Sequence, residues 1–145
     1  MKTLLLCLLF VSSSLHASSL ENWLTVQEKA SWQKLFANLS PEGTRAGAVI
    51  ASPQRRDPDY FFHWVRDAAL VMDVVMMDER QSPSANNAQH IQQYVDFSLY
   101  IQDQTTLTDL GEPKYHVDGS SFNGPWGRPQ NDSPALRALY LVRHA

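Results

Sequence analysis

The 145-residue sequence contains one cysteine, Cys7, which lies in an apolar segment near the N-terminus. The rest of the chain therefore has no thiol that could form a disulfide, act as a nucleophile or bind a metal. Small residues of the kind that precede the cysteine of a lipoprotein processing site are also missing. These absences exclude disulfide-stabilised and thiol-dependent classes of protein.

Motifs of several enzyme classes are absent as well. His63, His90, His116 and His144 stand far apart, without the HExxH spacing of zinc peptidases. There is no Gly-x-Ser-x-Gly turn for a serine nucleophile and no glycine-rich phosphate loop. We therefore predict no metal site and no cofactor, and we expect His63 to pack among aromatic neighbours.

Basic residues are in the minority, with 12 Lys and Arg against 15 Asp and Glu. Removal of the N-terminal segment described next takes away Lys2 and leaves a net charge of −4. Such a surface repels phosphate backbones and anionic lipid head groups, so we expect no nucleic-acid or membrane partner. A neutral substrate remains compatible.

The apolar run Leu4–Val11 follows Met1 and Lys2, and small and polar residues follow it as far as Ala17. This order is typical of a secretory signal peptide, and the run is too short to span a bilayer. We predict that residues 1–17 are a signal peptide cleaved after Ala17 and that the mature protein is secreted or periplasmic. A buried N-terminal helix is the alternative.

Apolar residues recur at helical spacing in four later segments, which indicates an all-α domain. The first expected helix is Leu20–Leu39, after the Ser-x-x-Glu capping box Ser18–Glu21. The others are a helix that follows Asp67 and runs to about Glu79, Ala88–Asp103, and a last helix that Ser133 caps and Pro134 begins. The apolar stripes expected in the second and third helices are Leu70, Val71, Val74 and Val75, and Ile91, Tyr94, Val95 and Leu99.

Between these helices we expect a short extended piece at Gly47–Ser52 and a long irregular loop at Thr105–Gly127. Loops longer than about 15 residues inside compact domains are usually functional.

The chain is organised around Asp57–Leu70, which reads DPDYFFHWVRDAAL. Five consecutive aromatic or imidazole side chains lead into the pair Arg66–Asp67 at the start of a predicted helix. Asp67 can cap that helix or direct a carboxylate into a cleft beside the rings. Aromatic walls with a carboxylate and a guanidinium suit the apolar faces and hydroxyl edges of sugars. Core aromatics with an N-cap remain the alternative.

Three stretches in this order resemble the signature of glycoside hydrolase family fifteen, the glucoamylases. They are PDYFFHWVRDAALV, GEPKYHVD at Gly111–Asp118 and GPWGRPQNDSPALR at Gly124–Arg137, and GAVIASP at Gly47–Pro53 also fits. The resemblance implies an (α/α)6 barrel of six outer and six inner helices. We expect residues 18–145 to be the N-terminal part of such a catalytic domain, about its first third, truncated from a longer, monomeric enzyme.

The resemblance implies that the complete enzyme releases glucose from the non-reducing ends of α-1,4-glucans such as starch, with inversion. Arg66 and Asp67 match the pair that holds the terminal glucose, and Tyr60 and Trp64 match residues that line its pocket. Trp126 matches a loop tryptophan that touches substrate and supports the catalytic acid. A hydrophobic plug between its neighbours is the alternative for Trp126.

The family shows Arg and Gly where this chain has Asn131 and Ser133, so Asn131 offers no ionic contact. Hydrolysis needs two carboxyl groups, and Asp118 and Asp132 are the best local candidates, although nothing in the sequence distinguishes them. By resemblance the catalytic Glu pair lies beyond Ala145, so we expect no catalytic residue in this chain.

Two other interpretations stay open. The chain is a non-catalytic carbohydrate-binding protein or pseudoenzyme, or it is an all-helical structural module whose aromatic residues only form a core. In the enzyme interpretation, we expect the 145-residue chain alone to be inactive and poorly folded, because its apolar helix faces lack partners.

Overall fold

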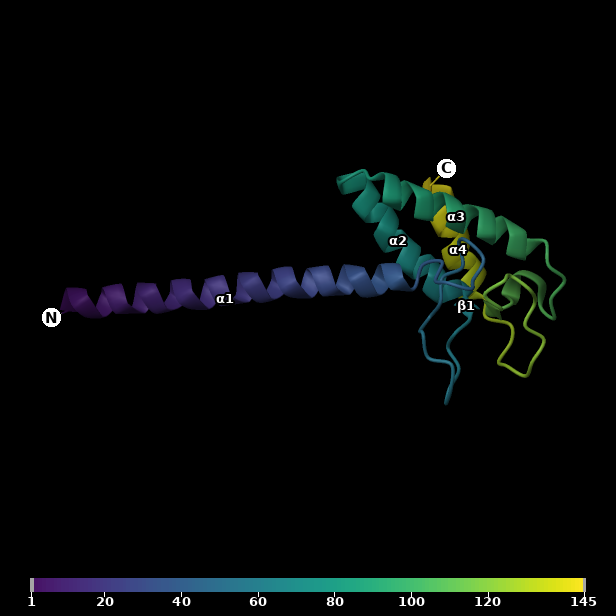
Figure 1. The fold of residues 1–145 in the computed structure, drawn as a ribbon, viewed down its shortest axis with the longest axis horizontal. Helices are drawn as coiled ribbons and strands as arrows, with labels where there is room; N and C mark the ends of the chain where they lie inside the picture. Colours follow the sequence, from purple (N-terminus) through teal and green to yellow (C-terminus); the bar gives the residue numbers. More distant parts are fainter. Residues whose placement is uncertain (1, 145) are drawn as a thin grey trace. The chain divides into compact units, whose positions relative to one another are not determined.

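The structure of the chain is a computed structural model that describes residues 2–144, with the side chains of residues 19–143. The elements in chain order are α1 (Lys2–Ala37), β1 (His63–Trp64), α2 (Val65–Gln81), α3 (Ala85–Gln102), the 3₁₀ helix η1 (Asp109–Gly111), β2 (Lys114–Tyr115) and α4 (Asp132–His144) (Figure 1). The predicted all-α class is confirmed. The chain divides into two compact units, Met1–Phe36 and Ala37–Ala145.

The first unit is one continuous helix, most of α1. The predicted helix start at Leu20 is wrong, because the helix already runs through the Ser-x-x-Glu motif. No glycine or proline occurs between Lys2 and Ala37 to interrupt it. Near its end, Trp32 and Phe36 stack with ring centroids 5.5 Å apart. The side chains of residues 2–18, where the predicted signal peptide falls, lie outside the described part.

Within residues 2–144, no helix is both long enough and apolar enough to cross a membrane. The predicted helix end at Leu39 is late by two residues, because Leu39 forms a β-bridge with Val49. Val49 and Ile50 both make such bridges, so the extended piece predicted at Gly47–Ser52 is present in short form.

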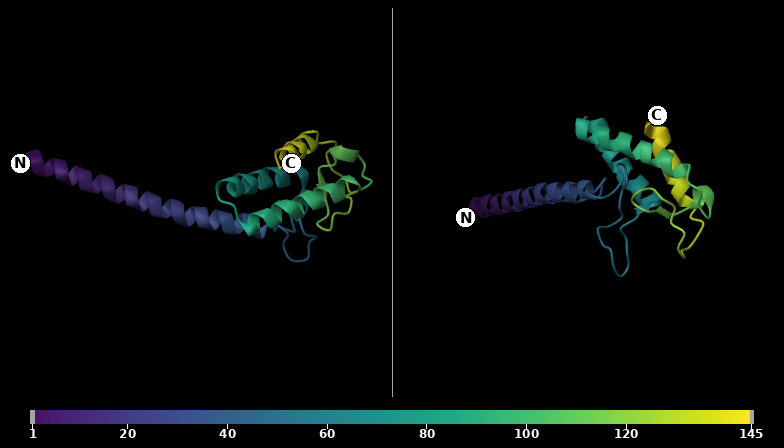
Figure 2. Two further views of the ribbon diagram at one scale, coloured as in Figure 1. Left: turned by 90° about the horizontal axis from the view of Figure 1, so that it is seen from above. Right: turned by 45° about the vertical axis from the view of Figure 1, so that its right-hand side comes forward.

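The α-helices of the second unit are α2, α3 and α4, and α2 packs against both α3 and α4 (Figure 2). The helix α3 begins three residues earlier than predicted because Ser84 caps it. The Ser84 side chain accepts a hydrogen bond of 3.1 Å from the amide of Asn87, which satisfies one of the free first-turn donors.

The apolar stripe predicted for α2 is only partly correct. Val75 is fully buried, but Leu70 and Val74 are exposed, at 52% and 45%, whereas Ala68, Ala69 and Met72 are buried. Small side chains allow neighbouring helices to approach closely, and this favours the alanine face as the packed face. In α3 the predicted Ile91 and Tyr94 are buried, but Leu99 is exposed.

The predicted cap of the last helix is also wrong. The helix α4 begins at Asp132, so Ser133 lies inside its first turn, fully buried. The amide of Ser133 donates to the carbonyl of Gln130 over 3.2 Å. Pro134 is tolerated there because first-turn amides have no acceptor within the helix, and Asp132 interacts favourably with the helix dipole.

A two-stranded antiparallel sheet joins the segment before α2 to the predicted loop. His63 pairs with Tyr115 and Trp64 pairs with Lys114. The region Thr105–Gly127 is thus not wholly irregular, since it contains η1 and β2. The segment before β1 and the segment between β2 and α4 project on the same side of the helices (Figures 1 and 2).

Beneath this sheet lies the buried apolar cluster of the second unit. It consists of Ala48, Val65, Phe97, Ile101 and Tyr115, each at most 2% exposed. The cluster joins the strands to α3 and gives the site described next a rigid base.

Candidate functional site

A pocket of about 260 Å³ opens where β1, the start of α2 and the loop before α4 meet. Its lining residues are Ala51, Tyr60, Trp64, Arg66, Asp67, Trp126 and Gln130. The structure therefore brings together all five residues that the sequence analysis selected as substrate-binding residues. The pocket is slightly smaller than the roughly 300–1,000 Å³ of typical small-molecule sites.

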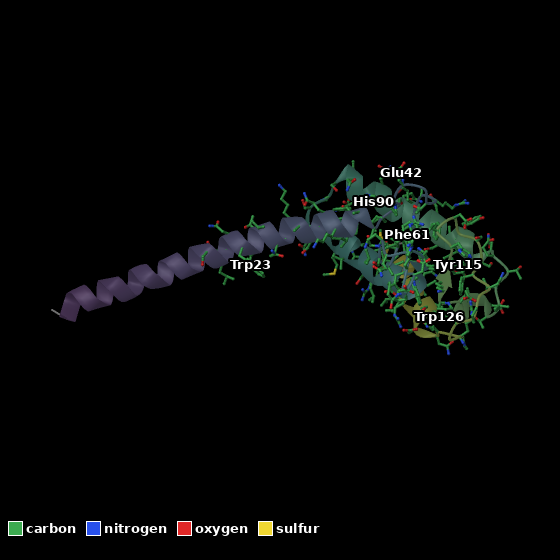
Figure 3. All side chains as sticks on the ribbon, turned by 60° about the horizontal axis from the view of Figure 1, so that its bottom comes forward. Trp23, Glu42, Phe61, His90, Tyr115 and Trp126 are labelled. Carbon is green, nitrogen blue, oxygen red and sulfur yellow. The ribbon has the colours of Figure 1, made fainter. Side chains whose placement is uncertain are left out.

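Aromatic rings form one wall of the pocket. Trp64 and Trp126 meet edge to face, with centroids 5.2 Å apart and planes at 77°. Tyr60 lies 6.4 Å from Trp64, tilted by 53°. Trp64 is only 7% exposed, whereas Tyr60 and Trp126 are 41% and 46% exposed. Trp126 lies at the edge of the second unit in Figure 3, so it is not the buried hydrophobic plug considered above.

Arg66 and Asp67 supply the polar part of the pocket, and their side chains are each 43% exposed. The pair is therefore open to solvent and not buried behind the aromatic rings. Asp67 does not cap α2 either, because Trp64 occupies the N-cap position and no side chain caps it. Asp67 lies in the first turn, where a carboxylate interacts favourably with the helix dipole and stays available to a ligand.

The guanidinium of Arg66 is held by two carboxylates. It donates to Asp132 over 3.0 Å and lies 3.9 Å from Asp67. The hydrogen bond that Arg66 donates to Asp132, together with the charges of both carboxylates, raises the pKa of Arg66. The same hydrogen bond lowers the pKa of Asp132. Asp132 is therefore ionised at neutral pH and is a poor proton donor.

Asp118, the other local carboxylate considered as an acid or base, does not line the pocket. It accepts hydrogen bonds from the amide and hydroxyl of Ser120, at 2.8 and 2.7 Å. These bonds lower the pKa of Asp118. Neither candidate thus has the raised pKa that a general acid needs.

The loop that carries Trp126 is held by an ion pair that the sequence analysis missed. Glu112 is fully buried, and both of its carboxylate oxygens accept from Nε of Arg128, at 2.8 and 2.9 Å. Arg128 also donates to the carbonyl oxygens of Gly124 and Phe122. Nothing in the sequence analysis distinguishes Glu112 from the other carboxylates of the loop. The neighbouring Gly111 and Pro113 were the available signal of a constrained, buried turn.

His63 lies behind the pocket wall, fully buried, with ring centroids 4.6 Å from Phe97 and 6.2 Å from Tyr94. The expected packing among aromatic side chains is confirmed. Its Nδ1 accepts a hydrogen bond of 3.0 Å from the amide of Val49. Burial, and to a smaller extent the charge of Arg137, lowers the pKa of His63 to about 3. His63 is therefore a neutral structural residue.

Among the side chains that the structure describes, no group of three or more His, Cys, Asp or Glu residues is arranged to hold a metal ion. The pocket can thus offer a ligand contact with aromatic rings and hydrogen bonds. Its charged groups are the guanidinium of Arg66 and the carboxylate of Asp67, with Asp132 paired to the same guanidinium. These are the elements with which proteins bind neutral polyols.

Comparisons with known proteins agree with this arrangement. Residues 29–144 match the glycosyl hydrolases family 15. Glucoamylase S1 of Saccharomyces cerevisiae is 38% identical over 143 residues, which cover 88% of this chain and 18% of the relative. Glucoamylase 1 of Rhizopus oryzae is 37% identical over 131 residues, which cover 88% and 22%.

Two solved structures have the same fold as this chain. Glucoamylase from Saccharomycopsis fibuligera superimposes with a TM-score of 0.83 at 34% identity, covering 86% of this chain and 28% of the solved one. A family 15 glucoamylase from Hypocrea jecorina gives 0.82 at 34% identity, covering 86% and 23%. The expected fold, part of the (α/α)6 barrel of the glucoamylases, is confirmed.

The chain spans about a fifth of the length of these curated relatives. One assignment follows from the three ordered motifs, the fold and the sequence identity with the glucoamylases. The chain belongs to glycosyl hydrolases family 15.

Proposed function

We propose that the natural polypeptide containing these residues is an inverting glucan 1,4-α-glucosidase that releases glucose from the non-reducing ends of α-1,4-glucans. The observation that carries the proposal is the pocket where Trp64 and Trp126 form a wall beside Arg66 and Asp67. In this proposal the rings contact the apolar faces of the terminal glucose. Asp67 accepts hydrogen bonds from its hydroxyls, and Arg66 donates to them.

The residues of this chain bind the sugar and do not transfer the proton. Among the side chains of residues 19–143, Asp67 is the only carboxylate that lines the pocket; it lies beside a guanidinium, and Asp132 is paired with the same guanidinium. An inverting glycosidase needs a protonated acid and a separate base on opposite sides of the scissile bond. We propose that both come from residues outside this chain, so the 145-residue chain alone is inactive.

We also propose that residues 1–17 direct export and are removed after Ala17. The basic start, the short apolar run and the small residues before the cleavage position support this. The mass or N-terminal sequence of the product outside the cell tests it. A product that begins at Ser18 is expected, and retention of Met1 would contradict the proposal.

The glucosidase proposal is tested by Asp67→Asn in the natural polypeptide, with maltose as substrate. A hydrogen bond to a charged group is worth about 1.5–3 kcal/mol, so kcat/KM is expected to fall about 10- to 150-fold. Asp73→Asn is the matched control, since it removes a carboxylate from the same helix that pairs instead with Arg143. Unchanged maltose turnover in Asp67→Asn would overturn the proposed site.

The carbohydrate-binding alternative is separated by one further measurement. Isothermal titration of the natural polypeptide with maltose reports binding, and glucose release is assayed on the same sample. Binding that Asp67→Asn weakens, with no glucose released, would favour a non-catalytic binding protein and contradict the glucosidase proposal.

A further inference from the structure

Lys114 is a largely buried lysine next to the pocket. The residue is 4% exposed, yet its ammonium group has no ion pair or hydrogen bond among the interactions of the described side chains. The carboxylate nearest in sequence, Glu112, already binds Arg128 with both oxygens. An ammonium group on a largely buried residue, with no carboxylate bound to it, needs another source of stabilisation.

Four aromatic rings surround this ammonium group. Nζ of Lys114 lies 4.0, 4.2, 4.3 and 4.9 Å from the ring centroids of Phe122, Trp126, Phe62 and Trp64. All four distances are within the range of cation–π attraction, which is strongest for tryptophan and for desolvated cations. The rings thus take the place of a counter-ion.

Two of these rings also line the pocket, and two do not. Trp64 and Trp126 belong to the pocket wall, whereas Phe62 and Phe122 are not among the lining residues. Lys114 therefore lies directly behind the aromatic wall. The pairing of the two strands fixes this position, because Trp64 and Lys114 are opposite each other in the antiparallel sheet and their side chains share one face.

Trp126 depends on this contact more than Trp64 does. Trp64 is 7% exposed and is held by the sheet, whereas Trp126 is 46% exposed and projects from a loop. Among the described interactions, the ring of Trp126 contacts only Trp64 and Lys114. Burial, together with the charge of Arg128, lowers the pKa of Lys114, whereas the charges of Asp59 and Glu112 oppose this shift.

We propose that Lys114 is a positioning residue of the sugar pocket: its ammonium group holds the ring of Trp126 against Trp64 and so sets the aromatic wall before sugar binds. This inference rests on the proposed function for its sugar readout, but it also predicts a property of the sugar-free protein. Lys114 itself lies behind the wall and does not contact the sugar.

The first test measures Trp126 without any sugar. Acrylamide quenching of tryptophan fluorescence is compared between the natural polypeptide and Lys114→Met, which keeps an unbranched apolar side chain without the charge. We expect quenching to increase in Lys114→Met, because Trp126 becomes more mobile and more accessible. The same comparison in a Trp126→Phe background should show no difference, which assigns the change to Trp126.

The second test measures maltose kinetics. Loss of a desolvated cation–π contact should raise KM about tenfold in Lys114→Met, with a smaller change in kcat. Lys114→Arg keeps the charge and should restore both KM and quenching. Arg45→Met is the matched control, because Arg45 lies 3.6 Å from the ring centroid of Tyr100, outside the pocket lining.

The outcomes separate the two proposals. Unchanged quenching and KM in folded Lys114→Met, or equal changes in Arg45→Met, would overturn the role of Lys114. If Lys114→Met does not fold, Phe122→Leu removes one ring from behind the ammonium group, and unchanged quenching in that variant would overturn the role as well. If the natural polypeptide releases no glucose from maltose, or if Asp67→Asn leaves its turnover unchanged, the glucosidase proposal is overturned. The quenching result still tests the role of Lys114 in that case.

Discussion

The guanidinium of Arg66, at the start of α2, lies 3.0 Å from the carboxylate of Asp132, at the start of α4. The two residues are 66 positions apart in the sequence, and the contact joins the first and third motifs of the family signature. It orients Arg66 beside Asp67 at the mouth of the pocket. An exposed ion pair of this kind contributes little to stability, so its main consequence concerns the geometry of the site.

We therefore expect Asp132→Asn to change sugar binding more than folding. With maltose, KM should rise about two- to fivefold, whereas the thermal midpoint should change as little as for other exposed pairs. Asp73→Asn removes the partner of Arg143, a pair with the same 3.0 Å distance. Equal KM values in the two variants would show that the Arg66–Asp132 contact has no role in the pocket.

Breaking the buried pair of Glu112 and Arg128 should instead change folding stability more than sugar binding. Glu112→Gln leaves a nearly buried guanidinium without its carboxylate, and we expect a loss of about 3–5 kcal/mol in the free energy of unfolding. Urea denaturation of the natural polypeptide measures it. The double variant Glu112→Gln/Arg128→Met should be less destabilised than the single variant, and a single variant as stable as Asp73→Asn would refute the prediction.

Acid should destabilise the fold through His63. Its folded pKa of about 3 lies below the unfolded value of 6.5, so the folded state binds fewer protons. The contribution of His63 is fully present above pH 6.5 and is lost as the pH falls toward 3, by up to about 1.4 kcal/mol per pH unit. The pKa values of Asp118 and Asp132 are lowered as well. Their contributions to folding stability are therefore lost only at a pH below the usual pKa range of aspartate.

Unfolding between pH 4 and pH 7 isolates the His63 effect. His63→Gln keeps an acceptor for the amide of Val49 but does not titrate, so its stability should vary less with pH in this window. His116→Gln changes an exposed histidine and is the control. An unaltered pH dependence in His63→Gln would contradict the assignment.

Two glycines with left-handed backbones should respond differently to alanine. Gly43 has φ +77° and open space around it, whereas Gly47 has φ +87° and a Cβ there would overlap the backbone carbonyl of Gln93. Gly43→Ala should cost about 1–2 kcal/mol for the backbone conformation alone. Gly47→Ala should cost roughly 1–3 kcal/mol more, and equal denaturation midpoints would contradict this.

The exposed apolar side chains of the second unit predict self-association of the 145-residue chain. Leu70 and Met77 on α2 are each 52% exposed, and Val74 between them is 45% exposed. Exposed apolar patches promote association, so light scattering of the purified chain should report oligomers. Leu70→Lys/Val74→Lys should reduce them. A monomer with a sharp, cooperative thermal transition would contradict both association and poor folding.

The sequence alone determined the all-α class, the approximate positions of three of the helices in the second part of the chain, and five of the seven residues that line the pocket. These features depend on local information. Apolar residues recur at helical spacing along each of these segments, and the aromatic run before Arg66 and Asp67 is continuous in the sequence. The ordered motifs also carried the family resemblance without any structure.

Only the tertiary structure decided which helix faces are packed and which contacts hold the pocket. The buried face of α2 is its alanine and methionine face, because packing depends on the shapes of α3 and α4 and not on hydrophobicity alone. The Glu112–Arg128 and Arg66–Asp132 pairs and the rings around Lys114 join residues from different elements. Such contacts depend on how the strands and helices meet in space, which periodicity and spacing do not encode.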